Sequence, residues 1–339
     1  MPLKAPHRLI DKKLREGRVV PFLGAGVNIR SPGRSIGGAP LPTGSQLSRQ
    51  LADLVSYPAE DDRDLDDLSK VTSYFVETSA RSVLRQELRA VFDVQTEPGP
   101  IHHYLASIDA PLLIVTTNYD DNMERALQRA GRPYELVVHP TDRKDYDASV
   151  FWWRAGATAP EKPVAPNKLL LDLQSSTVVY KMHGTMHRSD AQWDSYVVTE
   201  DDYVEFLSRM AGQSAVPSQF IRHFRSRHFL FLGYGLRDWN LRVLLRSLAL
   251  APSGGVAPAT VDDRSTTQEP SEEALAVASD ERVKSWAIQY KPSAIELQLW
   301  GARDVRIFDE AIDDFTDAVR AAPPVVPPLV PQQAPPLAP

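Results

Sequence analysis

The sequence predicts an α/β fold, and three short stretches carry that prediction. Each is an apolar run that ends in glycine or in polar residues, and these runs lie at Val19 to Leu23, Leu112 to Val115 and Thr177 to Met182. Buried strands that alternate with helical stretches favour a parallel sheet, whose carboxyl ends meet in one crevice where ligands bind. The expected class is a Rossmann-like, mostly parallel sheet flanked by helices, with helical and irregular insertions.

The composition is that of an ordinary globular chain. It has 339 residues, of which 42% are hydrophobic and 24% are charged, and its net charge is −6. It contains no cysteine, which excludes disulfides, thiolate zinc sites and a cysteine nucleophile. Neither a long basic run nor an apolar run of the ~20 residues that span a bilayer is present, so a cytoplasmic location is expected.

Periodicity, capping residues and turn residues predict the elements of the first half. Gly17 is expected to end the first helix, Thr43 and Gln46 resemble a capping box, and Gly131 follows the fourth helix. The expected helices lie at 7–17, 45–55, 68–92 and 121–130, and the expected strands at 19–23, 112–115 and 134–138. Residues 141–167 contain frequent prolines and are expected to form an irregular insertion.

The second half is expected to add further strands and helices, the last of which close the same core. The expected strands lie at 177–182, 196–199, 228–232, 282–290 and 305–308, and the expected helices at 200–210, 239–248 and 309–321. The predicted organisation is a core over 1–250 with a helical insertion at about 45–100 and an irregular one at about 141–167, a flexible linker at 251–279, closing strands and a helix of that core at 280–321, and a Pro-rich, disordered tail at 322–339.

The first motif is Gly24-Ala25-Gly26, directly after the first strand. Glycines at this point allow the backbone to approach a pyrophosphate closely, because a side chain would block the phosphates. The third glycine of the usual dinucleotide fingerprint is absent, and a simple tight turn between strand and loop is the structural alternative.

The second motif is Thr117-Asn118-Tyr119-Asp120, at the end of the second strand. The amide of Asn118 can hold a water or a sugar hydroxyl without adding charge, and the Asp120 carboxylate can accept from a carboxamide or a hydroxyl. Alternatively, Asn118 or Asp120 caps the helix that begins near Asp121.

The third motif places His183 and Gly184 at the end of another strand. A histidine here can act as a general base near neutral pH, or it can be a hydrogen-bonded structural residue. His187 lies four positions on, which would suit a metal pair on a helix. Gly184 between the two histidines and the lack of an obvious third ligand argue against a metal, and none is expected.

The fourth motif runs from Gly233 to Asn240 and also follows an apolar strand. Glycines at Gly233 and Gly235 would admit a ribose or an adenine against the backbone, with Tyr234 between them. A helix start with Asp238 as its N-cap is the structural alternative, and the two interpretations are compatible.

Taken in chain order, these four motifs resemble the sirtuin fold. More specifically, they resemble the sirtuin-like NAD-hydrolase domains of prokaryotic anti-phage defence systems. The run from Ser195 to Tyr203 and the segment from Leu236 to Asn240 are similar to this prokaryotic branch, and the resemblance covers about Val19 to Leu248.

The resemblance implies that Asn118 and His183 form a catalytic pair that cleaves the bond between nicotinamide and ribose in NAD. Asn118 would position a water or the ribose, His183 would accept a proton as the neutral imidazole, and Asp120 would help to fix the nicotinamide side. NAD would be the substrate, and no metal is implied. The implied NAD-binding residues are Gly24, Ala25, Gly26, Asn28, Thr117, Asp120, Gly233, Tyr234, Gly235 and Asp238.

Three departures from the family narrow the implied activity. Asn28 stands where a serine is typical, the chain lacks the four-cysteine zinc module of protein deacylases, and the Asp-Phe-Arg element of deacylases is absent between Asn28 and Pro42. These differences argue against deacylation and leave the NAD-cleaving residues in place.

The function implied is therefore that of an NAD glycohydrolase, which gives nicotinamide and ADP-ribose as the effector of an abortive-infection system. Because such an activity is toxic, gating by a homo-oligomer or by a separately encoded partner, such as a HerA-like ATPase, is expected. Contact with nucleic acid is expected only through a partner, and direct membrane contact is not expected. The alternative is a non-catalytic subunit that senses NAD or ADP-ribose within a defence complex.

Overall fold

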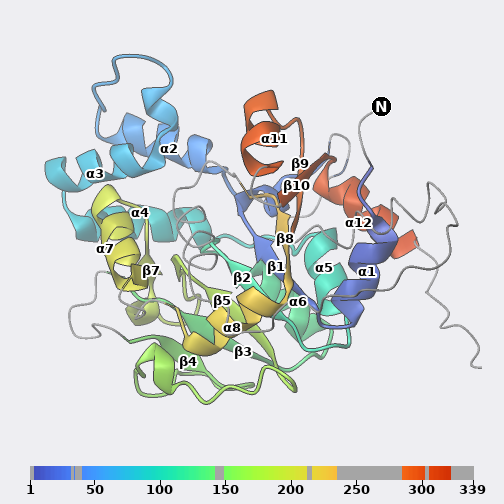
Figure 1. The fold of residues 1–339 in the computed structure, drawn as a ribbon. Helices are drawn as coiled ribbons and strands as arrows, with labels where there is room; N and C mark the ends of the chain where they lie inside the picture. The colour runs from blue at the N-terminus through green and yellow to red at the C-terminus, as the bar shows by residue number, and fades with distance from the viewer. Residues whose placement is uncertain are drawn as a thin grey trace, which may run out of the picture.

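An eight-stranded sheet forms the centre of the computed structural model, which describes residues 4–31, 34, 40–141, 149–211, 216–234, 285–301 and 305–321 (Figure 1). Its strand order is β10-β9-β8-β1-β2-β5-β3-β4, and every pairing is parallel except that of β3 with β4. The strands are β1 (Val19–Leu23), β2 (Leu113–Thr116), β3 (Tyr134–Val138), β4 (Phe151–Trp153), β5 (Thr177–Lys181), β8 (His228–Leu232), β9 (Ser285–Gln289) and β10 (Val305–Asp309). The predicted α/β class with a mostly parallel sheet is confirmed.

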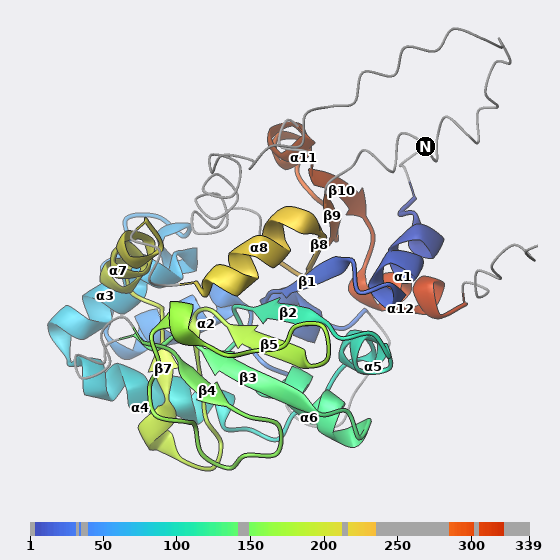
Figure 2. The same ribbon diagram turned by 60° about the horizontal axis from the view of Figure 1, so that its bottom comes forward.

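Both faces of the sheet are buried, which explains why its strands are continuous apolar runs rather than alternating ones. In β1, Val20 and Phe22 enter one core, whereas Val19 and Leu23 enter the core on the opposite face. The helices α7 (Glu200–Ala211) and α8 (Ser218–Ser226) contribute to the first core (Figure 2). The second core is covered by α1 (His7–Arg15), α5 (Pro100–Ala106), α6 (Asn122–Arg129) and α12 (Ile312–Ala321).

A third core belongs to a group of helices at the carboxyl end of β2. It joins α2 (Gly44–Leu54), α3 (Leu68–Thr78) and α4 (Arg81–Phe92), which gather on one side of the molecule in Figures 1 and 2. Tyr119, Met186 and Tyr196 pack into this core from the sheet side, the last from the hairpin of β6 (Gly184–Thr185) and β7 (Ser195–Tyr196). These helices therefore stand directly beside the loop that follows β2.

Most of the predicted elements are confirmed, with local corrections. The capping box is present, because Thr43 accepts from the Gln46 backbone and Gln46 accepts from the Thr43 backbone. The helix predicted over 68–92 is two helices, since Ala80 is extended and interrupts it. The predicted irregular stretch 141–167 is wrong in part, because β4 lies within it and completes the sheet edge.

The remaining described elements are short or lie near the chain end. They are α11 (Ala294–Gly301) and the 3₁₀ turns η1 (Ala25–Asn28), η2 (Asp64–Asp66), η4 (Pro166–Lys168) and η5 (Ala191–Trp193). No helix in the described part of the chain is both long and apolar enough to cross a bilayer. The predicted helix at 239–248, the whole of the predicted linker and the predicted tail lie outside the described residues.

The connections around β1 create a switch in strand order. From β1 the chain passes to β2 on one side, whereas β8, β9 and β10 lie on the other. In open parallel sheets this is the position at which ligands bind, beyond the carboxyl ends of the strands. The loops after β8, β1, β2 and β5 are neighbours at this edge.

Candidate active site

The four predicted motifs follow four adjacent parallel strands, so the sheet brings them to one edge. Gly24 follows β1, Thr117 follows β2, His183 follows β5 and Gly233 follows β8. Gly235 and Asp238, which the sequence analysis also assigned to this site, lie outside the described residues.

The turns after β1 and β8 pack backbone against backbone. The Gly24 amide donates to the Leu232 carbonyl over 3.0 Å, and the Gly26 amide donates to the Gly233 carbonyl over 2.8 Å. A Cβ atom at Gly24 would lie 2.7 Å from the Gly233 oxygen, and one at Gly233, where φ is +59°, would lie 2.3 Å from the Val27 nitrogen. The glycines are thus required by turn packing itself. Ala25, between them, is exposed and leaves the turn accessible.

Asn118 is oriented by the turn after β1. Its side-chain Nδ2 donates to the Gly24 carbonyl over 3.1 Å, and its backbone amide donates to Thr116 Oγ1 over 3.0 Å. The Thr117 amide donates to the Leu23 carbonyl, which fixes the loop to β1 a second time. Asn118 is 8% exposed, and no described residue donates a hydrogen bond to its Oδ1. The amide therefore keeps one acceptor for a ligand.

Asp120 and Asn28 connect the turn after β1 to helix α6. Asn28 Nδ2 donates to Asp120 Oδ2 over 2.9 Å, and Asn122 Nδ2 donates to Asn28 Oδ1 over 3.0 Å. Asp120 Oδ1 accepts from the Asn122 backbone amide at the first position of α6. Asp120 therefore accepts from a backbone amide at the start of α6, although Asp121 is the N-cap residue of that helix. The side-chain amide of Asn28 uses both its nitrogen and its oxygen in this bridge.

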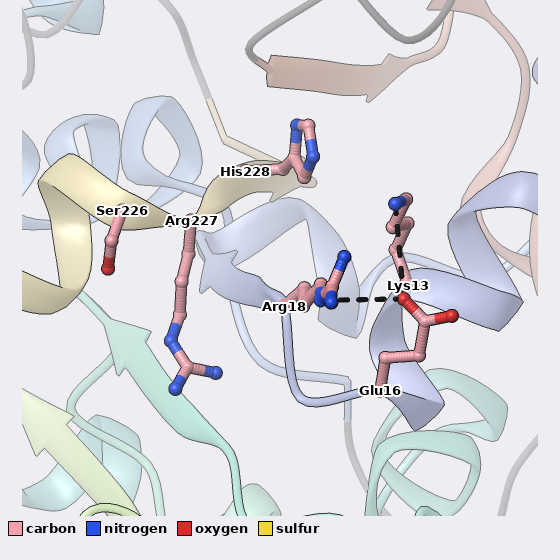
Figure 3. A pocket seen from close by; sticks show the side chains of 6 residues that line it. All are labelled: Lys13, Glu16, Arg18, Ser226, Arg227 and His228. Atoms are coloured by element: carbon pink, nitrogen blue, oxygen red, sulfur yellow. Dashed lines mark ion pairs between the residues drawn. The ribbon is translucent and has the colours of Figure 1, made fainter. Parts of the chain in front are cut away.

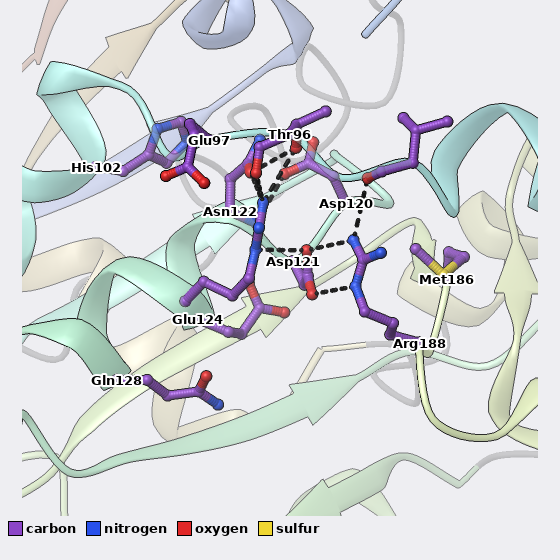
Figure 4. Close-up of polar contacts among 12 residues, drawn as sticks. Thr96, Glu97, His102, Asp120, Asp121, Asn122, Glu124, Gln128, Met186 and Arg188 are labelled. Atoms are coloured by element: carbon purple, nitrogen blue, oxygen red, sulfur yellow. Dashed lines mark hydrogen bonds and ion pairs between the residues drawn. The ribbon is translucent and has the colours of Figure 1, made fainter. Parts of the chain in front are cut away.

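A charged network supports this loop from behind (Figure 4). Asn122 Oδ1 accepts from Thr96 Oγ1 over 2.9 Å and from Arg125 Nη2 over 2.6 Å. Asp121 faces Arg188, which donates to both of its carboxylate oxygens, at 2.9 and 3.0 Å. Burial acts to raise the pKa of Asp121, but the Arg188 hydrogen bonds and the Arg125 charge outweigh it and hold that pKa below its usual value.

His183 is enclosed by helix α7. It is 3% exposed, and its ring lies edge-on to the rings of Tyr203 and Phe206, with centroids 5.6 and 5.9 Å away. Its carbonyl accepts from the Val197 amide over 2.9 Å, which ties it to the chain after β7. The imidazole thus sits in an apolar setting that excludes bulk water.

The contacts of His187 do not indicate the function predicted for His183. Its ring stacks on Trp153 at 5.4 Å with an interplanar angle of 18°, and its amide donates to Asp194 Oδ1. Among the residues described, no group of three or more His, Cys, Asp or Glu side chains could hold a metal ion. His187 is therefore a structural residue of the β6–β7 hairpin.

Tyr234 has a buried ring rather than one that faces a ligand. It packs edge-on to Phe22 with centroids 5.3 Å apart and belongs to the core on the α8 side. What Tyr234 can offer at the strand edge is its backbone.

Two buried groups near the site escaped the sequence analysis. Lys181, the last residue of β5, is 0% exposed and pairs with Glu124 of α6 over 2.9 Å. His139 follows β3, and its ring packs edge-on to Phe206 at 5.1 Å. Burial, with the Arg209 and His183 charges, lowers the pKa of His139 to about 3, so it is neutral at physiological pH. The sequence feature that could have identified both residues is a polar side chain at the end of a strand. The apolar residues around each of them made this feature easy to miss.

A cavity of about 400 Å³ lies at the opposite edge of the sheet, at the amino ends of β1 and β8 (Figure 3). Glu16 pairs there with Lys13 at 3.9 Å and with Arg18 at 3.6 Å, and Arg227 extends away from that group. Because it opens at the amino ends of the strands, this cavity is separate from the strand-end motifs.

Comparison with known proteins identifies the family. The family profile described as "SIR2-like domain" matches residues 112–300, which include the loops after β2, β5 and β8. The resemblance expected from the motifs is confirmed. The turn after β1 lies outside the matched range.

Two characterised proteins are similar over most of this chain. Defense-associated sirtuin 2 of Bacillus subtilis is 23% identical over 237 residues, which are 70% of this chain and 20% of that protein. The NAD(+) hydrolase ThsA of Acinetobacter baumannii (strain 532279) is 28% identical over 245 residues, which are 71% of this chain and 41% of that protein. The chain therefore spans less than half the length of either relative.

Proposed function

The chain belongs to the SIR2-like domain family, and from that premise we propose that it is an NAD glycohydrolase. It would cleave the bond between nicotinamide and ribose and release nicotinamide and ADP-ribose. The observation that carries the proposal is the placement of Asn118, which is anchored to Gly24 through Nδ2 and keeps Oδ1 available at the switch in strand order. The name of the relative ThsA, an NAD(+) hydrolase, supports the same substrate.

The residues at this edge suit a dinucleotide. The exposed turn around Ala25 leaves room for a pyrophosphate to approach the backbone, although the Gly24 and Gly26 amides are already bonded to β8 and its turn. Thr117 and Asn118 offer neutral polar groups to ribose hydroxyls. The nearby carboxylate of Asp120 is already bonded to Asn28 and to the Asn122 amide, which limits its repulsion of the phosphates. The glycines after β1 and β8 allow the two turns at this edge to pack closely against each other.

The proposed reaction consumes one water. As the nicotinamide–ribose bond breaks, its electron pair passes to the nicotinamide nitrogen, and the ribose develops oxocarbenium character. A water oxygen then bonds to the anomeric carbon and loses a proton. Asn118 Oδ1 would accept a hydrogen bond from that water or from a ribose hydroxyl, and His183 would take the proton as a neutral imidazole.

The enclosure of the two residues supports gated activity. Asn118 is 8% and His183 is 3% exposed, the latter beneath Tyr203 and Phe206 of α7. We propose that a homo-oligomer or a partner such as a HerA-like ATPase opens the site. The name of the relative Defense-associated sirtuin 2 supports a role in defence, in which NAD depletion would arrest an infected cell.

Nicotinamide release from NAD tests the proposal, with the protein alone and with the product of a neighbouring gene. The native protein is expected to release nicotinamide, and His183→Ala to reduce turnover by a factor on the order of 10² or more. His187→Ala is the matched control, because His187 stacks on Trp153, and it should retain turnover within about threefold. Equal loss in both variants would contradict the assignment of His183.

The low exposure of Asn118 and His183 also favours a second candidate, a subunit that senses NAD or ADP-ribose without turnover. Tight NAD binding without nicotinamide release, in the assembled complex as well as alone, would identify it. Release that requires His183 would exclude it.

A further inference from the structure

A buried ammonium joins the strand that leads to His183 with the loop that carries Asn118. Lys181 Nζ donates to the carbonyl of Tyr119 over 3.2 Å, to the carbonyl of Asp120 over 2.5 Å, and to Glu124 Oε1 over 2.9 Å. An ammonium has three protons, and here each has an acceptor. Lys181 is 0% exposed, so these contacts are shielded from water.

Stability alone explains this arrangement poorly. Burying two opposite charges costs several kcal/mol per ion, and apolar residues of similar volume often stabilise a fold as well or better. Burial raises the pKa of Glu124 although the Lys181 charge acts to lower it, and no described residue donates to Glu124 Oε2. Apolar residues at these two positions could replace the ion pair without its cost. The presence of the pair therefore suggests a role beyond stability.

The two carbonyls belong to the residues directly after Asn118, and Lys181 lies two residues before His183. In the sheet, Lys181 is the partner of Thr116 at the end of β2. One side chain therefore spans the two proposed catalytic loops at the point where the backbone pairing of β2 and β5 stops. Tyr119 is held a second time by the Met186 amide over 3.0 Å, whereas Lys181 is the donor that reaches the Asp120 carbonyl.

A direct chemical role for Lys181 does not fit these contacts. A lysine that acts as a nucleophile or base needs an unprotonated amine that faces the substrate. This ammonium is fully buried and bonded to three oxygens, one of them a carboxylate.

We propose that Lys181 is a positioning residue, which sets the Asn118 loop against His183 through its bonds to the Tyr119 and Asp120 carbonyls. This inference rests on the proposed function of the site. A displacement of about 1 Å between reacting groups is enough to lower turnover about 10²-fold. Loss of the Lys181 hydrogen bonds should therefore lower kcat more than it weakens substrate binding.

The test removes both charges at once, because Lys181→Met alone would strand the Glu124 carboxylate in the core. The full-length Lys181→Met/Glu124→Leu protein is expected to stay folded, with some loss of stability because the Asp120 carbonyl loses its donor. It should bind NAD within about threefold of the native Kd. Its kcat for nicotinamide release should fall about 10- to 100-fold. Hydrogen exchange of the peptide over 117–121 should become faster, which reports the loop independently of activity.

Glu124→Gln is the matched control. Its amide oxygen can still accept from Lys181 Nζ, so the ammonium keeps an acceptor for each of its three protons. Lys181 then stays bonded to both loop carbonyls, and kcat should stay within about threefold of native. If the double variant does not fold, this control still decides: a loss of kcat as large as that expected for the double variant would overturn the role of the carbonyl contacts.

The outcomes separate the two proposals. Native kcat and native exchange in the double variant would overturn the positioning role and leave the NAD-cleaving function standing. Absence of nicotinamide release from the native protein, alone and with its partner, would instead overturn the proposed function, and the exchange rates would still show whether Lys181 orders the loop.

Discussion

Asn118 donates its side-chain amide to the carbonyl oxygen of Gly24 over 3.1 Å, so the loop after β2 takes its orientation from the turn after β1. The bond fixes which end of the amide faces the ligand edge. With Nδ2 occupied, Oδ1 is the atom left for a water or a hydroxyl. The glycine turn therefore contributes to the proposed chemistry through Asn118 as well as through its own backbone.

This relationship predicts that both Asn118→Ala and Asn118→Asp lose turnover by a factor on the order of 10² or more. Alanine removes the acceptor, and aspartate cannot donate to the Gly24 carbonyl, because an ionised carboxylate carries no proton. Nicotinamide release measured at saturating NAD checks both variants. An Asn118→Ala protein that cleaves NAD at the native rate would refute the assignment.

The motifs at the strand ends could be predicted because each consists of residues that are adjacent in the sequence. An apolar run that ends in Gly24, in Asn118 or in His183 identifies a strand and its carboxyl end together, and parallel strands bring those ends to one edge. The family resemblance depends on the same local residues, which is why it too could be read from the sequence.

Contacts between distant side chains were not predictable in this way. The amide of Asn28 bridges Asp120 and Asn122, more than 90 positions away, and no local pattern encodes its orientation. Tyr234 follows a strand like a ligand residue but turns its ring into the core beside Phe22. Lys181 looks like the polar end of a strand, and only the packing of α6 reveals its role.

The Asn28 bridge predicts a stability effect. Asn28→Ala should lower the free energy of unfolding by about 1–2 kcal/mol, because it removes two side-chain hydrogen bonds and leaves Asp120 and Asn122 with unmet partners. Urea denaturation measures the change. Ser208→Ala, at an exposed position of α7, is the control and should change the free energy by less than about 0.5 kcal/mol. Equal values for the two variants would show that the bridge contributes nothing.

Gly233 and Gly131 offer a matched pair for the turn packing. Both have positive φ, +59° and +65°, but a Cβ at Gly131 would meet no atom within 4 Å, whereas one at Gly233 would lie 2.3 Å from the Val27 nitrogen. Gly131→Ala should therefore cost only backbone strain, about 1 kcal/mol. Gly233→Ala should cost about 3 kcal/mol or more, because the turn after β1 must also move. Similar urea midpoints for both variants would contradict the packing described here.

Acid should destabilise the fold through its buried histidines. Burial, with the charges of Arg30, His103 and Arg125, lowers the pKa of His102 to about 3, and His102 Nδ1 accepts from the Gly99 amide over 3.0 Å. The pKa of His139 is likewise lowered to about 3. The unfolded chain, with histidine pKa values of about 6.5, binds more protons below that pH.

The sign follows from this difference in protonation: each histidine contributes stability that is complete above about pH 6.5 and is lost as the pH falls toward about 3. The loss should approach about 1.4 kcal/mol per pH unit for each group. Unfolding free energies from urea denaturation at pH 7.5, 6.5 and 5.5 check it. His102→Asn, which can still accept from the Gly99 amide, should reduce the slope between pH 6.5 and 5.5 by one histidine's share, since all other titrating groups are common to both proteins. Parallel curves for the native and variant proteins would mean that His102 is not held neutral by the fold.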